Sequence, residues 1–394
     1  MKNPNNKLTI VLFRNYGIKY GRGYQPVYIY RYLEDILYRM YLLRVQGKHR
    51  PPKKIKTLPI HLQFVIYLNN ILLQKYFKIK IFNRSLYDFF NEYLIKNINL
   101  NTKYYLFNYA PHEDLLKKLK RNNKELSLYY GGMSPLYYYE TKKEELKKIG
   151  LTIDKKEYES GRGEDILIKK YFKNVILMSD YSKDNWIKHG YEGNIYVNKL
   201  GVDFEYFNKP INEKQRISNK IFLFVGRIEV MKGVHYLLDA WEQLDLRDAK
   251  LWLVGQKKSK GWEYFENRIK NMQNVEYLGY KTDLSDSYNK SLVFVLPTLS
   301  EGFGKVVLEA MASGLPIIGT PCVSEQFEHG KEGFNVNYRD VGGLKKYIQY
   351  YYDNPEKAIE MGYNAKLKAK NRTWDKFGEN FRNNILTILN GEKQ

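Results

Sequence analysis

Short apolar segments alternate with amphipathic segments along most of the chain. In the second half, predicted strands lie at residues 221–225, 250–254, 275–278, 293–296 and 316–319. Predicted helices lie between them, at 234–244, 264–272, 284–290 and 305–313. Strands that alternate with helices form parallel sheets, because each connection has to cross back over the sheet. The pattern therefore predicts an α/β fold with doubly wound sheets.

The first half alternates less regularly. Strands are predicted at 8–13, 104–107, 127–130 and 175–178, helices at about 24–43 and at 180–189, and a polar break at 45–57. A polar stretch rich in Asn, Lys and Glu runs to Asn219 and marks a boundary. We predict two Rossmann-like domains that face across a cleft, with a final helix that packs on the first domain. Their predicted ranges are 1–205, 206–375 and 376–394.

Charge is distributed unevenly between the two halves. Of the 65 Lys and Arg and 43 Asp and Glu residues, 37 and 18 lie in residues 1–200, which gives +19; the other 28 and 25 give +3. Two explanations stay open: a lysine-rich composition with solvated side chains, or a basic surface that binds an anionic membrane or a phosphorylated acceptor. Residues 61–77 form the most apolar helix-like stretch, suited to domain packing or to lying on a membrane surface.

Cysteine content and apolar patterning indicate the compartment. Cys322 is the single cysteine, so an intramolecular disulfide framework is excluded and a reducing compartment is favoured. The sequence contains no run of about 18 apolar residues that could span a membrane, and the N-terminal residues 1–8 are polar. We predict a cytoplasmic protein, with peripheral membrane contact as the alternative.

A first motif follows the predicted strand 221–225. Gly226 allows a sharp turn, and Arg227 and Lys232 lie on the loop that leads into the next helix. The carboxyl ends of strands are where open α/β sheets bind ligands. Two cations beside a helix N-terminus suit a diphosphate, whereas the alternative is a pair of solvated loop charges.

A second motif lies in residues 297–316, between two predicted strands. Gly302 and Gly304 let the backbone approach a ligand closely, and the following helix start offers free N–H groups to an anion. Glu301 suits the hydroxyls of a sugar. Glu309 lies about two turns into an otherwise apolar helix and is expected to be paired or bound, with ribose hydroxyls as one ligand.

Together the two motifs resemble the nucleotide-sugar-binding domain of retaining glycosyltransferases of the GT-B architecture, in particular glycosyltransferase family 4 (group 1). The resemblance covers roughly residues 175–380. Its matching elements are Gly226-Arg227, Lys232-Gly233, Glu301 and Glu309 around Gly302-Phe303-Gly304, the run 309–316, Leu278-Gly279, Gly201-Val202-Asp203 with Phe207, Glu325, Gly330 to Gly333, and Trp374 with Phe377.

The resemblance implies a role for each matching residue. Arg227 and Lys232 would hold the donor diphosphate and, with Glu301 on the sugar hydroxyls, carry catalysis. Glu309 would bind the ribose, and Tyr280 would contact the base. The full set of implied donor-binding residues is Gly226, Arg227, Lys232, Tyr280, Glu301, Gly302, Phe303, Gly304, Lys305 and Glu309.

The first domain matches the family less well. Gly21 and Gly23, with Gly17, occupy the place of the family's glycine-rich acceptor loop, but their spacing is irregular. Many members carry a histidine at the end of a middle strand, where this chain has Gly131-Gly132. His112 is only a weak substitute for that histidine, because a histidine at such a position is more often an ordinary surface residue. The tyrosines at 137–139 suit either sugar stacking or ordinary packing.

The implied enzyme is a retaining hexosyltransferase that takes sugar from a UDP-, GDP- or dTDP-sugar to a glycan or lipid-linked acceptor. No Asp-x-Asp pair or cluster with metal-ligand spacing occurs, and Arg227 and Lys232 supply the neutralising charge, so we expect no metal and no cofactor. A phosphorylase or a nucleotide-sugar epimerase of the same fold is the alternative. Nucleic-acid binding by the basic half is a remote one, because its charges are not interleaved with aromatics in a known reader; we expect no such partner.

Overall fold

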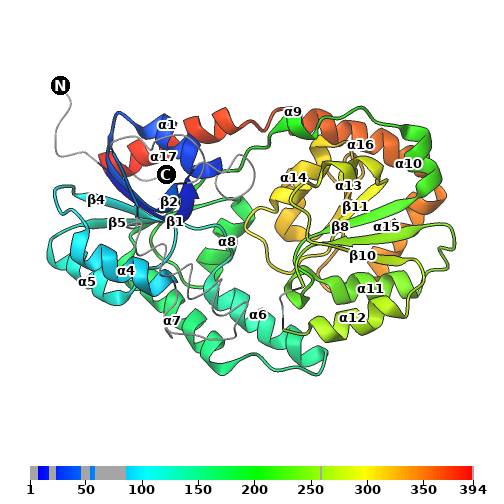
Figure 1. Cartoon of the computed structure of the whole chain (residues 1–394), viewed down its shortest axis with the longest axis horizontal. Coiled ribbons are helices and arrows are strands. Elements are labelled where there is room, and N and C mark those ends of the chain that lie inside the picture. The colour runs from blue at the N-terminus through cyan, green and yellow to red at the C-terminus, as the bar shows by residue number, and fades with distance from the viewer. Residues whose placement is uncertain (1–7, 17–23, 46–53, 58–85, 258–259, 393–394) are drawn as a thin grey trace.

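The computed structural model describes residues 8–16, 24–45, 54–57, 86–257 and 260–392. They form two α/β halves that lie side by side along the long axis of the molecule (Figure 1). The first half and the connection after it contain β1 (Leu8–Tyr16), α1 (Tyr24–Leu33), β2 (Leu37–Val45), β3 (Ile55–Thr57), α4 (Leu86–Asn97), β4 (Tyr104–Phe107), α5 (Glu113–Arg121), β5 (Glu125–Tyr129), α6 (Pro135–Lys148), α7 (Lys155–Tyr171), β6 (Asn174–Leu177), α8 (Asp180–Lys188), β7 (Asn194–Val197), α9 (Phe204–Phe207) and α10 (Glu213–Asn219).

The second half begins with a buried strand and ends with three long helices. Its elements are β8 (Ile221–Val225), the short 3-10 helix η4 (Val230–Lys232), α11 (Val234–Glu242), β9 (Lys250–Val254), α12 (Trp262–Lys270), β10 (Val275–Gly279), α13 (Ser285–Lys290), β11 (Val293–Leu296), α14 (Lys305–Ala312), β12 (Ile317–Gly319), the 3-10 helix η5 (Pro321–Gln326), β13 (Gly333–Asn335), α15 (Val341–Asp353), α16 (Pro355–Lys370) and α17 (Trp374–Asn390).

Each half is built on a parallel sheet. Among the described residues the first sheet has the order β3-β2-β1-β4-β5-β6-β7 and the second β10-β9-β8-β11-β12-β13. Strands β4, β6, β8 and β11 are buried along their whole length, because apolar side chains on both faces are covered by helices. This confirms the predicted α/β fold with two Rossmann-like sheets.

Strand order reverses at one place in each sheet: between β1 and β4, and between β8 and β11. Connections leave in opposite directions at such a point, so a crevice opens beyond the carboxyl ends of the two strands. In the second half, the two loops that border this crevice are residues 226–233 and 297–304, which carry the two motifs. The topology therefore brings the motifs together.

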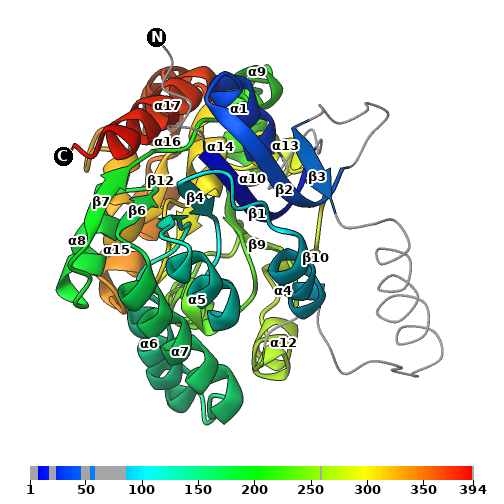
Figure 2. The same cartoon turned by 90° about the vertical axis from the view of Figure 1, so that its left-hand side faces the viewer.

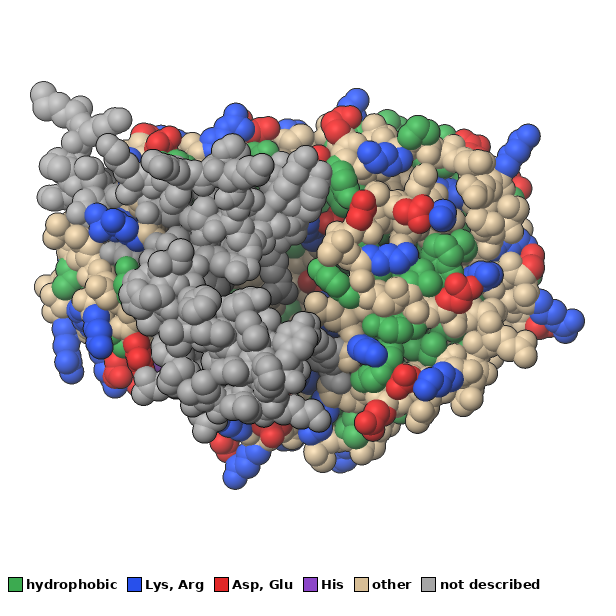
Figure 3. Space-filling model, in the orientation of Figure 1, with side chains coloured by type: hydrophobic (Ala, Val, Ile, Leu, Met, Phe, Trp, Pro, Cys, Tyr) green, Lys and Arg blue, Asp and Glu red, His purple; other side chains and the backbone are tan. Residues whose placement is uncertain are grey.

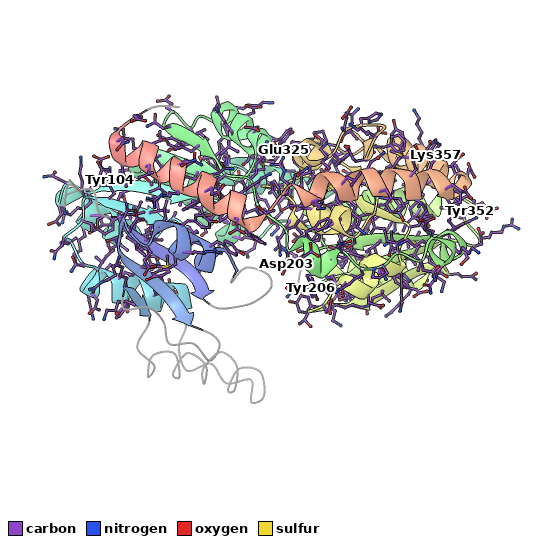
Figure 4. The ribbon with its side chains drawn as sticks, turned by 90° about the horizontal axis from the view of Figure 1, so that it is seen from above. Tyr104, Asp203, Tyr206, Glu325, Tyr352 and Lys357 are labelled. Carbon is purple, nitrogen blue, oxygen red and sulfur yellow. The ribbon has the colours of Figure 1, made fainter. Side chains whose placement is uncertain are left out.

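The last helix, α17, returns over the first half, whereas α16 covers the second (Figure 4). Phe381 is fully buried and packs edge-on against Tyr129 at the end of β5, with ring centroids 5.2 Å apart. Arg382 donates to both carboxylate oxygens of Asp35, at 2.6 and 2.7 Å. The predicted return of this helix is confirmed. The predicted domain limits at 205 and 375 stay predictions.

One predicted helix is wrong. Residues 24–43 do not form a single helix, because α1 ends at Leu33 and Leu37–Val45 form β2, which pairs with β1 and β3. Leu37 and Met40 are buried in the sheet. The apolar pattern of this segment suits a helix or a strand, and the pairing of β2 on both of its edges favours the strand. The polar break predicted at 45–57 likewise contains β3. The predicted helix at 61–77 lies outside the described residues.

Candidate functional site

The two motif loops are bonded to one another. The backbone N–H of Leu299 donates to the carbonyl of Met231 at 2.9 Å, and the Thr298 hydroxyl donates to the same carbonyl at 3.1 Å. Gly233 joins η4 to α11 with φ +67°, and a Cβ there would lie 2.0 Å from the carbonyl oxygen of Pro297. Only glycine fits both conditions. The loops therefore form one rigid wall of the crevice.

The predicted cations and carboxylates meet on this wall. Lys232 forms an ion pair with Glu301, and both side chains are largely buried, at 15% and 23% exposed. The Arg227 guanidinium lies 2.9 Å from the Glu229 carboxylate and is half exposed. Burial lowers the pKa of Arg227, but Glu229, Tyr138 and Glu301 raise it overall. Sequence reasoning found Arg227, Lys232 and Glu301 and missed Glu229. It named Tyr138 for sugar stacking or packing, but not as a neighbour of Arg227.

The segment 302–304 leads directly into α14. Gly304 precedes the helix with φ +75°, and a Cβ there would lie 3.3 Å from the side chain of Glu301. Phe303 is buried. The buried Gln326 amide donates to the carbonyls of Phe303 and Gly304, which fixes the orientation of the loop. Gln326 was missed, because no sequence pattern links η5 to this loop.

Glu309 is buried and paired, as the sequence predicted. Its exposed fraction is only 5%. Lys305, one turn earlier on α14, lies 2.8 Å from one carboxylate oxygen, and the hydroxyl of Tyr288 donates to the other at 3.2 Å. Burial and the neighbouring Glu309 raise the pKa of Tyr288 well above its ordinary value. Tyr288, on α13, was another partner that the sequence did not reveal.

The remaining predicted residues lie apart from this wall or outside the described part of the chain. Tyr280 follows Gly279 at the end of β10 and is 63% exposed. Gly21 and Gly23 lie outside the described residues. His112 begins the turn into α5, and its Nε2 lies 3.1 Å from the carboxylate of Asp88 on α4.

The first half closes directly on the motif loops. A Cβ on Gly302 would lie 2.2 Å from the carbonyl oxygen of Gly131, which follows β5. The hydroxyl of Tyr137 on α6 donates to the carbonyl of Leu299 at 2.9 Å. Glu325, which lies where the halves meet (Figure 4), accepts the Asp180 N–H at the start of α8 at 3.0 Å. The site is thus bordered by both halves.

The described part of the chain holds neither a metal-binding cluster nor a membrane-spanning helix. Among those residues no group of three or more His, Cys, Asp or Glu side chains could hold a metal ion. None of the described helices is both long and apolar enough to cross a lipid bilayer.

Comparison with solved structures identifies the fold. Sucrose-phosphate synthase of Thermosynechococcus elongatus superposes with a TM-score of 0.72 at 16% identity, over 98% of this chain and 100% of that one. HepE of Anabaena, solved with UDP and glucose, superposes with a TM-score of 0.66 at 17% identity, over 96% and 99%. The chain has the GT-B glycosyltransferase fold.

Sequence comparison finds related proteins. Residues 219–354 match the family model described as glycosyl transferases group 1. The capsular polysaccharide biosynthesis glycosyltransferase CapM of Staphylococcus aureus is 27% identical over 225 residues, 52% of this chain and 57% of that protein. The chain spans about half the length of the curated relatives it matches.

Proposed function

We propose that this chain is a retaining, metal-independent family 4 glycosyltransferase that moves a sugar from a nucleoside-diphosphate sugar to a glycan or lipid-linked acceptor. One observation carries the proposal: Arg227, Lys232 and Glu301 gather with the start of α14 at the switch point of the second sheet. Cations and a free helix N-terminus at this place suit a diphosphate.

The charges of the site suit departure of a nucleoside diphosphate. In the reaction the bond from the anomeric carbon to the diphosphate breaks, and negative charge grows on the leaving oxygens. Arg227, Lys232 and the N–H groups at Gly304 would stabilise that charge. Lys232 would exchange Glu301 for phosphate, which frees Glu301 to accept hydrogen bonds from the sugar hydroxyls.

The other donor contacts follow the same arrangement. Glu309 would hold the ribose, since carboxylate oxygens can accept additional hydrogen bonds beside those of Lys305 and Tyr288. The exposed Tyr280 would contact the base. The acceptor oxygen would attack the face from which the diphosphate leaves, and its proton would pass to the departing oxygen. Retention rests on the family resemblance.

Related proteins favour the substrate class. HepE was solved with UDP and with UDP-glucose, and CapM acts in capsular polysaccharide biosynthesis. We therefore place UDP-sugars first among UDP, GDP and dTDP donors, and a glycan or its lipid-linked precursor as acceptor. Such acceptors agree with a cytoplasmic enzyme whose basic first half, at +19, contacts an anionic membrane surface.

Titration calorimetry with UDP, GDP and dTDP tests the diphosphate site. We expect one of them to bind, and Lys232→Ala to weaken binding at least tenfold, about 1.4 kcal/mol, because a buried cation is lost. Lys250→Ala is the matched control, since Lys250 lies on the exposed start of β9 and pairs with Glu276. Equal affinities in the two variants would contradict the assignment. A panel of donor sugars scored for slow hydrolysis then identifies the donor.

A further inference from the structure

A single carboxylate is completely buried where the two halves meet. Glu145 on α6 has an exposed fraction of 0%. It accepts hydrogen bonds from His235 Nε2 at 2.9 Å and from the Tyr236 hydroxyl at 2.7 Å, both on α11, and from Arg339 Nε at 2.7 Å. Lys148, one turn further along α6, donates at 2.9 Å. These five residues are here called the Glu145 cluster.

Most hydrogen bonds of the Glu145 cluster can form only when the two halves touch. A buried carboxylate is tolerated only when cations and donors surround it, and three of the four donors come from the second half. Burial raises the pKa of the Glu145 carboxyl, but the hydrogen bonds from its four partners outweigh burial and lower it below the ordinary value. Separation of the halves would expose the carboxylate and leave it with Lys148 alone of its four partners.

The backbone of Arg339 gives a second indication that the folded structure favours this contact between the halves. Its φ is +64°, in the left-handed region that non-glycine residues rarely adopt. Such strain persists only where the surroundings fix it. Here the guanidinium is fixed by Glu145 and, at 3.2 Å, by the neighbouring Glu144.

Chain connectivity links the cluster to the proposed donor site. His235 and Tyr236 are the second and third residues of α11, and α11 begins immediately after Lys232 and Gly233. The same helix α6 reaches the other motif loop through the bond from Tyr137 to Leu299. Figure 1 shows α6 extending from the first half toward α11. One helix of the first half thus contacts both loops.

We propose that Glu145 is a positioning residue: through the start of α11 it holds the 226–233 loop against the first half, in the geometry that binds the donor. The proposal rests on the proposed function, because it takes that loop as the diphosphate site. It assigns to the first half a role in donor binding besides that of holding the acceptor.

The distance between the halves is the first readout. Spin labels are attached at Arg121→Cys, at the end of α5, and at Lys357→Cys on α16, both exposed. Helices α5 and α16 lie at opposite ends of the molecule (Figure 1). The native Cys322 is buried and its pKa is raised to about 11, so it does not react. We expect Glu145→Gln to lengthen and broaden the distance distribution, because the amide loses the charge that Arg339 and Lys148 require.

Glu144→Gln is the matched control. It makes the same change one residue earlier, on the same helix and beside the same Arg339, but its side chain is 65% exposed. We expect the control to keep the distance distribution and the nucleoside-diphosphate affinity, and Glu145→Gln to weaken that affinity about tenfold. If Glu145→Gln matches the control in distance, or shifts the distance without changing the affinity, the positioning role is wrong.

A milder variant keeps the test decisive if Glu145→Gln fails to fold. Tyr236→Phe removes the hydroxyl that donates to Glu145 and accepts from Lys148 but preserves packing and the buried charge, so a smaller shift in distance and in affinity is expected, and an absence of both contradicts the proposal. The distance measurement does not depend on activity. Wild-type protein that binds no nucleoside diphosphate would overturn the proposed function alone, while the distance distributions would still decide whether Glu145 holds the halves together.

Discussion

Lys232 and Glu301 form an ion pair. Their charges therefore nearly cancel where they meet, and the desolvated lysine does not need a counterion from solvent. In the proposed reaction an incoming diphosphate would replace one carboxylate by two or more negative oxygens, so it would compete well for Lys232. Glu301 would then lose its cation, and sugar hydroxyls could satisfy it. Binding of the donor and release of Glu301 would thereby be coupled in one exchange.

Glu164 on α7 supplies a prediction on pH. Burial and the charge of Asp165 raise its pKa to about 7, against a hydrogen bond with Tyr130 that lowers it. Since the folded pKa lies above the ordinary 4.5, the folded state binds this proton more tightly. The contribution of Glu164 to stability is therefore fully present below pH 4.5 and is lost as the pH rises to 7, by up to about 3 kcal/mol.

Glu164→Gln should remove that loss. Urea denaturation at pH 5 and at pH 8 would show the variant gaining stability relative to wild type at the higher pH. Glu159→Gln, at an exposed position on the same helix, is the control and should leave the pH dependence unchanged. If the stability of the wild type rose between pH 5 and pH 8 by as much as that of Glu164→Gln, the raised pKa of Glu164 would be refuted.

The junction of η4 and α11 shows how closely the elements of the second half are fitted. Gly233→Ala combines a left-handed residue with a Cβ that lies 2.0 Å from the Pro297 carbonyl, whereas Gly330, with φ +82°, has nothing within 4 Å of its Cβ position. Gly330→Ala should cost about 1 kcal/mol from strain alone. Gly233→Ala should cost at least about 2 kcal/mol more, because the two motif loops must separate. Equal losses in chemical denaturation would show that the close approach does not matter.

Strands that the sequence predicted correctly share one property. Ile221–Val225, Lys250–Val254 and Val293–Leu296 were predicted with their observed limits, because each is an apolar run that ends where polar, glycine or proline residues begin. The mistaken helix at 24–43 contains a strand that depends on its neighbours in the sheet. Strands β3 and β13 hold too few apolar residues to leave a pattern, whereas the equally short β12 was predicted from its apolar run.

The candidate site divides in the same way. Most site residues within the two contiguous motifs were found, with Glu229 as an exception, because each motif lies between a buried strand and a helix. Tyr138, Tyr288 and Gln326 reach the site from elements distant in sequence, and their place in it depends on packing that no local pattern encodes. Tyr280 was placed by resemblance alone.

At the scale of the whole molecule, the two halves differ in charge. On the face shown in Figure 3, acidic and basic side chains are interspersed over the second half, in agreement with its near-neutral balance. We expect the whole chain to float with vesicles that contain anionic phospholipid at low salt, and to be released by salt because screening weakens the attraction. Vesicles of neutral phospholipid are the control. Equal flotation with both, or with neither, would contradict a membrane role for the basic half.

The two halves approach each other closely at Gly302, on the 297–304 loop. Its φ is not in the left-handed region, and a Cβ there would lie 2.2 Å from the Gly131 carbonyl of the first half. Gly302→Ala should therefore leave the second half folded and still able to bind a nucleoside diphosphate, while it prevents full contact between the halves.

Because transfer needs donor and acceptor in one closed site, we expect sugar transfer by Gly302→Ala to fall at least tenfold, about 1.4 kcal/mol in activation free energy. Gly342→Ala is the control, since its Cβ would meet only Asp340, at an ordinary 3.5 Å. Transfer rates, diphosphate affinity and thermal unfolding are measured for both variants. Unaltered transfer in Gly302→Ala would mean that the reaction proceeds with the halves further apart than they stand in this structure.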